Sequence, residues 1–189
     1  VKRAPEYLAR EISDIPGVRV AETRIVEGAI LDMPGFAEPV VANLHSLPER
    51  SSQLLNVLVI RTGRPIDPTR ADEVVVSEPF AEAHHLRLGD SFDAVLRGRK
   101  RTLQVVGTAL SPEFVYAIAP GGLMPDDERF GILWMGHEAL AAAFDLKASF
   151  NSVTLSLLPG ADERDVIRRL DNLLVPFGAT GAYGRADQT

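Results

Sequence analysis

The clearest helical pattern lies near the C-terminus. Apolar residues recur there at the spacing of one helix face: Val166, Ile167, Leu170, Leu173 and Leu174. Asp162 can cap this helix, and Pro176 and Gly178 would end it. A second helix is predicted to start at Pro5, because proline suits a first helical turn, and to end at residues 14–17. The pattern therefore predicts a helix near each end of the chain.

Runs of alternating or continuous apolar residues predict the strands. They cover residues 18–26, 40–47, 54–61, 74–76, 92–96, 103–105 and 152–158, with a last short strand at 182–185. Residues 97–100 join two of these strands as a tight hairpin. Two more helices are expected at 79–86 and 137–144. Glycine and proline interrupt residues 28–39, so that stretch is expected to be a loop.

The two ends of the chain carry similar patterns, helix–strand at the start and strand–helix–strand at the finish. Between them lies mostly β structure. We therefore expect an α+β fold with two lobes. Residues 1–27 and 150–189 would form an α/β lobe from both chain ends, and residues 28–149 a β-rich lobe inserted between them.

Composition narrows the functional classes. The 189 residues are 46% hydrophobic and 24% charged, which is typical of a folded domain. With no cysteine, the chain has no disulfide, thiol nucleophile or cysteine-bound metal. The 26 acidic and 20 basic side chains argue against a general nucleic-acid binder, which needs a basic face. No apolar run approaches the length that crosses a bilayer.

The candidate catalytic and metal-binding groups are weak. His84 and His85 are adjacent, so on a helix they point about 100° apart and chelate one metal poorly. Residues 126–128 (DDE) could hold a hard cation, although capping carboxylates in a solvated loop are the commoner case. No serine-hydrolase elbow, Walker A loop or dinucleotide fingerprint is present. We predict no catalytic and no metal-binding residue.

Two surface features remain as candidate contacts. The basic cluster at Arg97, Arg99, Lys100 and Arg101 could touch anionic lipid or another protein, although a solvated turn is the commoner role. The aromatic side chains between residues 114 and 135, together with a methionine there, could instead line a ligand groove or partner surface, or pack as core. We call these residues the aromatic stretch. We take its members as the candidate contact residues and expect at least some to be exposed or to line a groove: Phe114, Tyr116, Phe130, Trp134 and Met135.

Several segments carry a family resemblance. They are KRAP (2–5), IPGV (15–18), DEVVVSEPFA (72–81), LRLGD (86–90), VVG (105–107), ALSPEFVYAI (109–118), PDDERFGILWM (125–135) and GAYGRADQ (181–188). Together they resemble the MacB-like periplasmic core domain of bacterial ABC transporter permeases of the FtsX/MacB type. The resemblance covers nearly the whole chain.

The resemblance implies a non-enzymatic role. In such permeases this domain lies on the extracytoplasmic side of the inner membrane, between the first and second transmembrane helices, so the start without Met is expected of an excised piece. ATP would be bound by a separate cytoplasmic ATPase subunit, with no cofactor in this domain. The domain would couple ATP-driven motion to the handling of a lipid, lipoprotein or peptide, or to the regulation of a periplasmic protein.

Two other classes stay open from the residues alone. A small hydrolase or metal-dependent enzyme would need converging acids and histidines, and only Glu78, His84, His85 and Asp90 could supply a local group. An oligomerisation or adhesion domain would need no such group.

Overall fold

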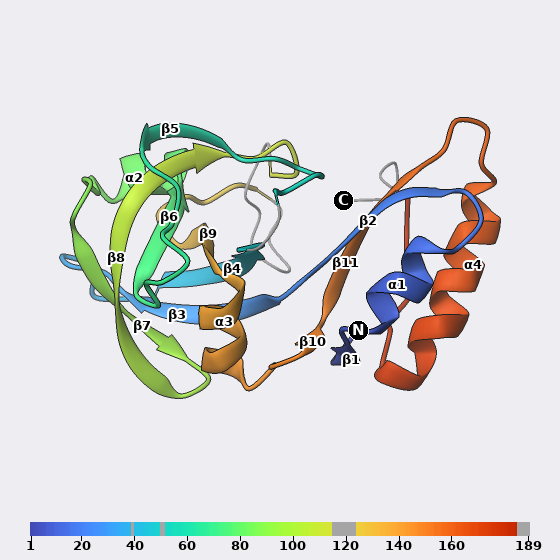
Figure 1. Cartoon of the computed structure of the whole chain (residues 1–189). Coiled ribbons are helices and arrows are strands. Elements are labelled where there is room, and N and C mark those ends of the chain that lie inside the picture. The colour runs from blue at the N-terminus through green and yellow to red at the C-terminus, as the bar shows by residue number, and fades with distance from the viewer. Residues whose placement is uncertain (39, 50–51, 115–123, 185–189) are drawn as a thin grey trace. The chain divides into compact units, whose positions relative to one another are not determined.

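The chain forms a mixed α+β structure, as expected. The computed structural model describes residues 1–38, 40–49, 52–114 and 124–184 (Figure 1). The chain divides into two compact units. We call residues 1–24 and 148–189 the terminal unit and residues 25–147 the inserted unit; the sequence prediction placed the corresponding divisions after residues 27 and 149.

A mixed sheet closes on itself in the inserted unit. Its strands are β3 (Val26–Asp32), β4 (Val40–Leu47), β5 (Val59–Gly63), β6 (Glu73–Ser77), β7 (Ser91–Leu96), β8 (Arg99–Leu110) and β9 (Phe130–Gly136). The order is β5-β8-β6-β9-β4-β3-β7, and β7 pairs in turn with β8. The long strand β8 makes this closure, because its first half pairs with β7 while its second half pairs with β6 and β5 (Figure 1). The result is a closed barrel, to which β5 is joined by its pairing with β8.

The barrel has an inner core and an outer apolar layer. The inner core takes alternate residues of the strands together with the buried faces of α2 (Glu78–Ala83) and α3 (His137–Phe144), among them Phe80 and Leu140. The outer layer consists of buried Val75, Val106, Ala109, Phe130, Ile132 and Trp134, covered by half-buried Leu47, Leu58, Ile60, Ile66 and Phe114. Every residue of β6 and β9 is buried, because apolar side chains cover both faces of these strands.

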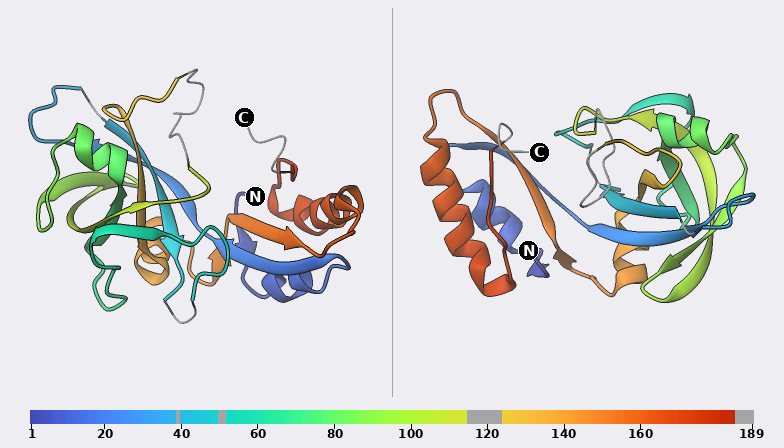
Figure 2. Two further views of the ribbon diagram at one scale, coloured as in Figure 1. Left: turned by 90° about the horizontal axis from the view of Figure 1, so that it is seen from above. Right: turned by 180° about the vertical axis from the view of Figure 1, so that it is seen from behind.

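The terminal unit is a smaller two-layer structure. Its elements are β1 (Ala4–Pro5), α1 (Leu8–Ser13), β2 (Val18–Arg24), β10 (Ser149–Phe150), β11 (Ser152–Leu157), α4 (Glu163–Leu174) and the 3₁₀ helix η1 (Val175–Phe177). β2 pairs antiparallel with β11, and β1 with β10. Figure 2 shows α1 and α4 on the same side of the β2–β11 pair. Their buried residues form one core with the inward residues of these strands: Leu8, Ile12, Val166, Leu170 and Leu174.

Several sequence predictions are confirmed. β4 and α3 have the expected bounds, and the hairpin of β7 and β8 turns at Arg97 and Gly98. α4 begins after Asp162, whose carboxylate accepts hydrogen bonds from the backbone N–H groups of Arg164 and Asp165. The cap and the apolar stripe therefore both act as the sequence indicates.

Other boundaries were wrong. Pro5 lies in β1 beside Ser149 and not in the first helix, which begins at Leu8. The expected loop at 28–39 begins with most of β3, because Gly28 stands in open space where a missing side chain does not interrupt pairing. Residues 182–184 form no strand.

The predicted buried strand at 54–61 is instead a folded loop followed by the largely exposed β5. The side chain of Gln53 binds both the carbonyl of Asn56 and the N–H of Leu58, and Asn56 adopts a positive φ of 51°. These local contacts bend the chain before it can extend. The reverse error occurs at β9, a fully buried strand to which the sequence pattern assigned no strand.

Candidate functional site

The aromatic stretch divides between two faces of β9. Phe130, Ile132 and Trp134 point into the outer layer, whereas Leu133 and Met135 point into the inner core. This alternation follows from the two-residue period of a strand. Gly131 is required on the inner side, because a Cβ there would lie 2.7 Å from the ring of Phe80. Aromatic rings therefore pack on both faces of β9, with Phe130 and Trp134 on the outer side and Phe80 on the inner side.

Phe114 is a half-buried aromatic residue that packs onto the outer layer. It follows the end of β8 in a turn in which its N–H donates to the carbonyl of Ser111. Its half-buried ring lies 4.8 Å from the ring of buried His45 and 6.5 Å from that of Trp134. His45 and Trp134 face each other across the parallel β4–β9 pair. The rings of Phe114, His45 and Trp134, which come from three separate segments, thus pack together at the outer layer.

The five candidate contact residues take different places. Phe130, Trp134 and Met135 are at most 3% exposed, so in this structure they pack as core. They are buried because β9 lies in the middle of the sheet with apolar cover on both sides. Phe114 is half-buried, and Tyr116 lies outside the described residues. The prediction of a contact surface stays a prediction, and of the described residues it now rests on Phe114.

An ion pair holds the covering layer in place. The buried carboxylate of Glu73 accepts two hydrogen bonds from the guanidinium of Arg64, at 2.8 and 2.6 Å, and a third from the N–H of Asp67 at 2.8 Å. The bonds from Arg64 hold the pKa of Glu73 below its usual value, although burial opposes them. Ile66, between the two donors in sequence, packs onto the outer layer. No sequence signal distinguished Glu73 from an ordinary charged residue at a strand start.

His84 is enclosed at another part of the inserted unit. Its ring lies 4.5 Å from the rings of both Phe36 and Phe80, and its Nε2 lies 2.9 Å from the carbonyl oxygen of Glu128. Burial lowers the pKa of His84, while the Glu128 carbonyl acts against that shift. A hydrogen bond from Nε2–H to this carbonyl ties the end of α2 to the segment before β9.

The residues that could have formed an enzyme site have separate partners. Glu78 pairs with Arg61 at 3.2 Å, and the carboxylate of Asp90 accepts the N–H of Arg87 at 2.8 Å. Asp126 accepts the N–H of Arg129 and so caps a turn. Within the described ranges no group of three histidine or acidic side chains is arranged to hold a metal ion. The described geometry supports structural roles for Glu78, His84, Asp90 and Asp126.

An exposed apolar row escaped the sequence prediction. Val95, Ile30 and Val41 are neighbours in register across β7, β3 and β4. They are 36%, 50% and 43% exposed, on the outer face of the barrel. The row could not be found from the sequence because it forms only when three separate strands come into register.

Comparison with known proteins identifies the fold. No protein-family model matches the chain, and no curated protein sequence matches it. Among solved structures, the periplasmic region of MacB from Actinobacillus actinomycetemcomitans matches with 15% identity and a TM-score of 0.54 over 92% of this chain and 75% of that one. The extracellular domain of the noncanonic ABC-type transporter YknZ from Gram-positive bacteria matches with 14% identity and a TM-score of 0.57, over 96% and 88%.

These similarities extend over almost the whole chain, so they include both units. No helix in the described part of the chain is long and apolar enough to cross a membrane. The resemblance seen in the sequence is thereby confirmed at the level of fold: the chain is folded like the extracytoplasmic domains of ABC-type transporters.

Proposed function

We propose that this chain is the extracytoplasmic domain of an ABC transporter permease in the inner membrane. The observation that carries the proposal is the match of nearly the full chain to two such domains. ATP is bound by a separate cytoplasmic ATPase subunit, and the domain itself holds no cofactor and performs no catalysis.

The proposed role is to couple ATP-driven motion to events outside the membrane. A lipid, lipoprotein, peptide or periplasmic protein is coupled to the cycle only if it binds one arrangement of the domain better than another. The internal construction of the inserted unit suits such a role, because a closed sheet with two apolar layers moves as one body. Motion is then expected between units and not within the barrel.

Spin labelling tests this proposal, and the 189 residues contain no cysteine of their own that would compete for the label. Spin labels on Arg10→Cys in α1 and Arg87→Cys after α2 would report the separation of the two units in the full-length permease with its ATPase. The distance distribution is expected to change between the nucleotide-free and the vanadate-trapped complex. A matched pair within the inserted unit, Arg70→Cys with Arg87→Cys, should keep its distribution in both states.

The outcomes separate the competing functions. An unchanged separation between the units, in a complex whose ATPase is active, would contradict the coupling role. Stoichiometric metal or turnover of a hydrolase substrate would favour an enzyme. A stable multimer of the isolated chain by light scattering would favour an oligomerisation or adhesion domain.

A further inference from the structure

The tip of the β7–β8 hairpin is a fixed basic structure. Arg97 and Gly98 form its turn with positive φ angles of 49° and 78°, the conformation that tight hairpins prefer. The guanidinium of Arg97 donates to the carbonyl oxygen of Phe144 at 2.5 Å and lies 3.4 Å from Asp145. This cation stands at the C-terminus of α3, where the helix dipole favours it. The turn is therefore fastened to the body of the barrel.

Two further arginines, Arg99 and Arg101, follow the turn and point to the same face of the hairpin. In the register of the hairpin, Arg99 stands opposite Leu96 and Arg101 opposite Ala94. Arg99 is exposed and Arg101 half-buried, and neither side chain has a hydrogen-bond or ion-pair partner among the residues that the structure describes. On a strand, the Cα atoms of residues i and i+2 lie about 7 Å apart, so the two guanidinium groups are close neighbours. They are placed to bind neighbouring anionic groups.

Lys100 occupies the opposite face of the hairpin. It pairs with Asp93 at 2.8 Å and Asp32 at 3.6 Å, so its single positive charge is shared between two acids. Its cross-strand neighbour is Val95, the first residue of the exposed apolar row that continues through Ile30 and Val41. Lys100 therefore adjoins the aliphatic row, whereas Arg99 and Arg101 lie on the other face of the hairpin.

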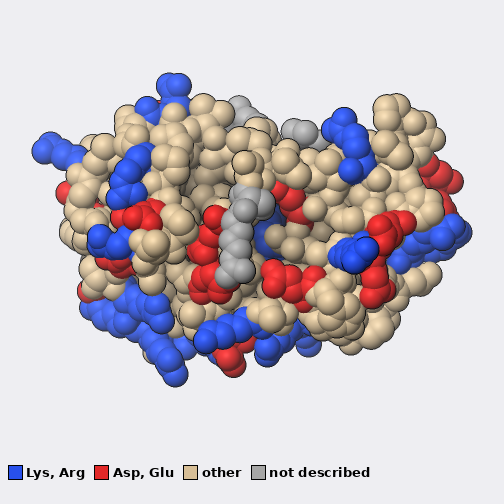
Figure 3. Space-filling model, in the orientation of Figure 1, with Lys and Arg blue, Asp and Glu red and all other residues tan. Residues whose placement is uncertain are grey.

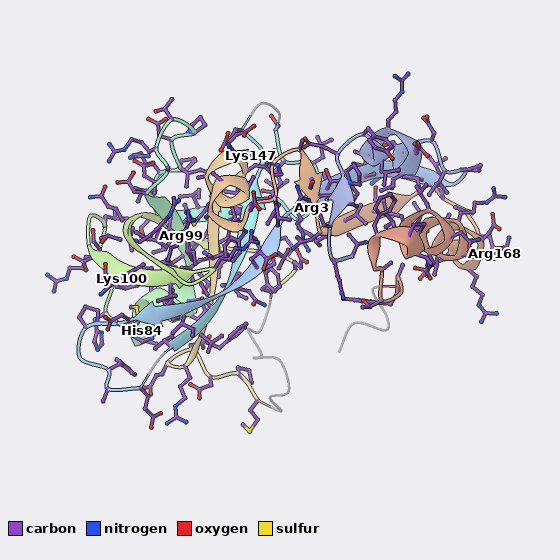
Figure 4. All side chains as sticks on the ribbon, turned by 90° about the horizontal axis from the view of Figure 1, so that it is seen from below. Arg3, His84, Arg99, Lys100, Lys147 and Arg168 are labelled. Atoms are coloured by element: carbon purple, nitrogen blue, oxygen red, sulfur yellow. The ribbon has the colours of Figure 1, made fainter. Side chains whose placement is uncertain are left out.

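Charge is unevenly spread over the inserted unit. It contains 11 basic and 17 acidic side chains, yet four of the basic ones fall within residues 97–101. Figure 3 shows Lys and Arg gathered along the lower left edge of the molecule, the edge that contains the hairpin. Figure 4, from below, labels Arg99 and Lys100 there, together with Lys147 after α3. A predominantly acidic unit with one basic end meets an anionic surface in one orientation.

We propose that this basic end, formed by Arg97, Arg99, Lys100 and Arg101, docks onto an anionic phospholipid surface. Guanidinium groups suit the phosphate oxygens of lipid headgroups, because they can donate paired hydrogen bonds to them. The basic end, residues 97–101, holds no aromatic anchor of the kind that dominates protein interfaces. These features favour a bilayer over a protein partner. The proposal is independent of the transport function.

Co-sedimentation of the 189-residue chain with vesicles tests the docking. Phosphatidylcholine vesicles are compared with vesicles in which phosphatidylglycerol replaces about a third of the lipid. Binding is expected only to the anionic vesicles and should fall as salt screens the charges. In the double variant Arg99→Gln/Arg101→Gln, partitioning should weaken about 30-fold, since each basic residue near the surface contributes about five-fold.

A matched control makes the result specific. Arg70→Gln/Arg87→Gln removes the same charge from exposed positions in the same unit and should retain nearly full binding. Both variants should keep the unfolding midpoint of the parent chain. Equal binding to both vesicle types, or equal loss in both variants, overturns the proposal. So does binding to soluble polyglutamate in the absence of binding to vesicles, which would indicate an acidic protein partner instead.

Discussion

The two units use their sheets in different ways. In the inserted unit every residue of β6 and β9 is buried, since the barrel interior covers one face and the outer layer the other. In the terminal unit no residue of β2 or β11 is fully buried, because α1 and α4 cover one face of a single strand pair. The inserted unit draws stability from closure, and the terminal unit from two helices.

This difference has consequences for stability. Closure supplies the strands of the barrel with backbone partners and surrounds a large inner core. Among its described residues, the terminal unit has eight buried apolar residues in its core, so each one matters more to its integrity. We expect local opening to begin in the terminal unit, and the predictions below test this contrast between the units.

The largest effect is expected from Phe80→Ala in the inserted unit. Phe80 is fully buried and fills the space that Gly131 leaves open. Its truncation should lower the free energy of unfolding by about 3–5 kcal/mol, measured by urea denaturation. Amide exchange should rise in β6 and β9 and stay unchanged in α4. Tyr7→Ala, at an aromatic that is 65% exposed, is the control and should change stability little.

A somewhat smaller effect, confined to the terminal unit, is expected from Leu170→Ala in α4. Leu170 is 5% exposed and belongs to the small core of the terminal unit. The loss should be about 2–4 kcal/mol of local stability, read from amide exchange in α4, β2 and β11. The barrel amides should retain their protection. Simultaneous loss of protection in both units would show that they unfold together, and the contrast drawn here would fail.

Local sequence signals predicted much of this fold for a physical reason. The cap at Asp162, the stripe of α4 and the turn at Arg97 and Gly98 are interactions between residues close in the chain. Patterns of this kind can be read without knowing the partners. The strand at 40–47 was found in the same way, from apolar residues that face the inner core.

Features that depend on distant partners could not be predicted. Nothing local shows that β8 pairs with three strands or that Phe130 and Trp134 receive a second apolar cover. The burial of the candidate contact residues could not be predicted either, because a run of aromatic residues gives the same sequence pattern whether it lines a surface or packs in a core. Only the closure of the sheet decides that Met135 points inward.

A smaller effect, dependent on pH, should arise from Glu73 in the inserted unit. Its pKa is held below the ordinary value of 4.5, first by Arg64, so the folded state favours the carboxylate. The resulting stability is present above pH 4.5 and is lost as the pH falls through the lowered pKa. Glu73→Gln should therefore flatten the acid limb of a plot of unfolding midpoint against pH. An acid limb as steep as that of the parent chain would show that other carboxylates cause it.

The smallest effect is expected from the cap of α4. Asp162→Ala removes the acceptor for the N–H groups of Arg164 and Asp165, and should cost about 1 kcal/mol. Asp162→Asn keeps an acceptor oxygen and should retain most of the stability, which separates loss of the cap from loss of charge. If the terminal unit depends on its helices, amide exchange in β11 should rise together with that in α4. A rise confined to the first turn of α4 would mean that the strand pair holds without the helix end, and that the two units differ less than their burial indicates.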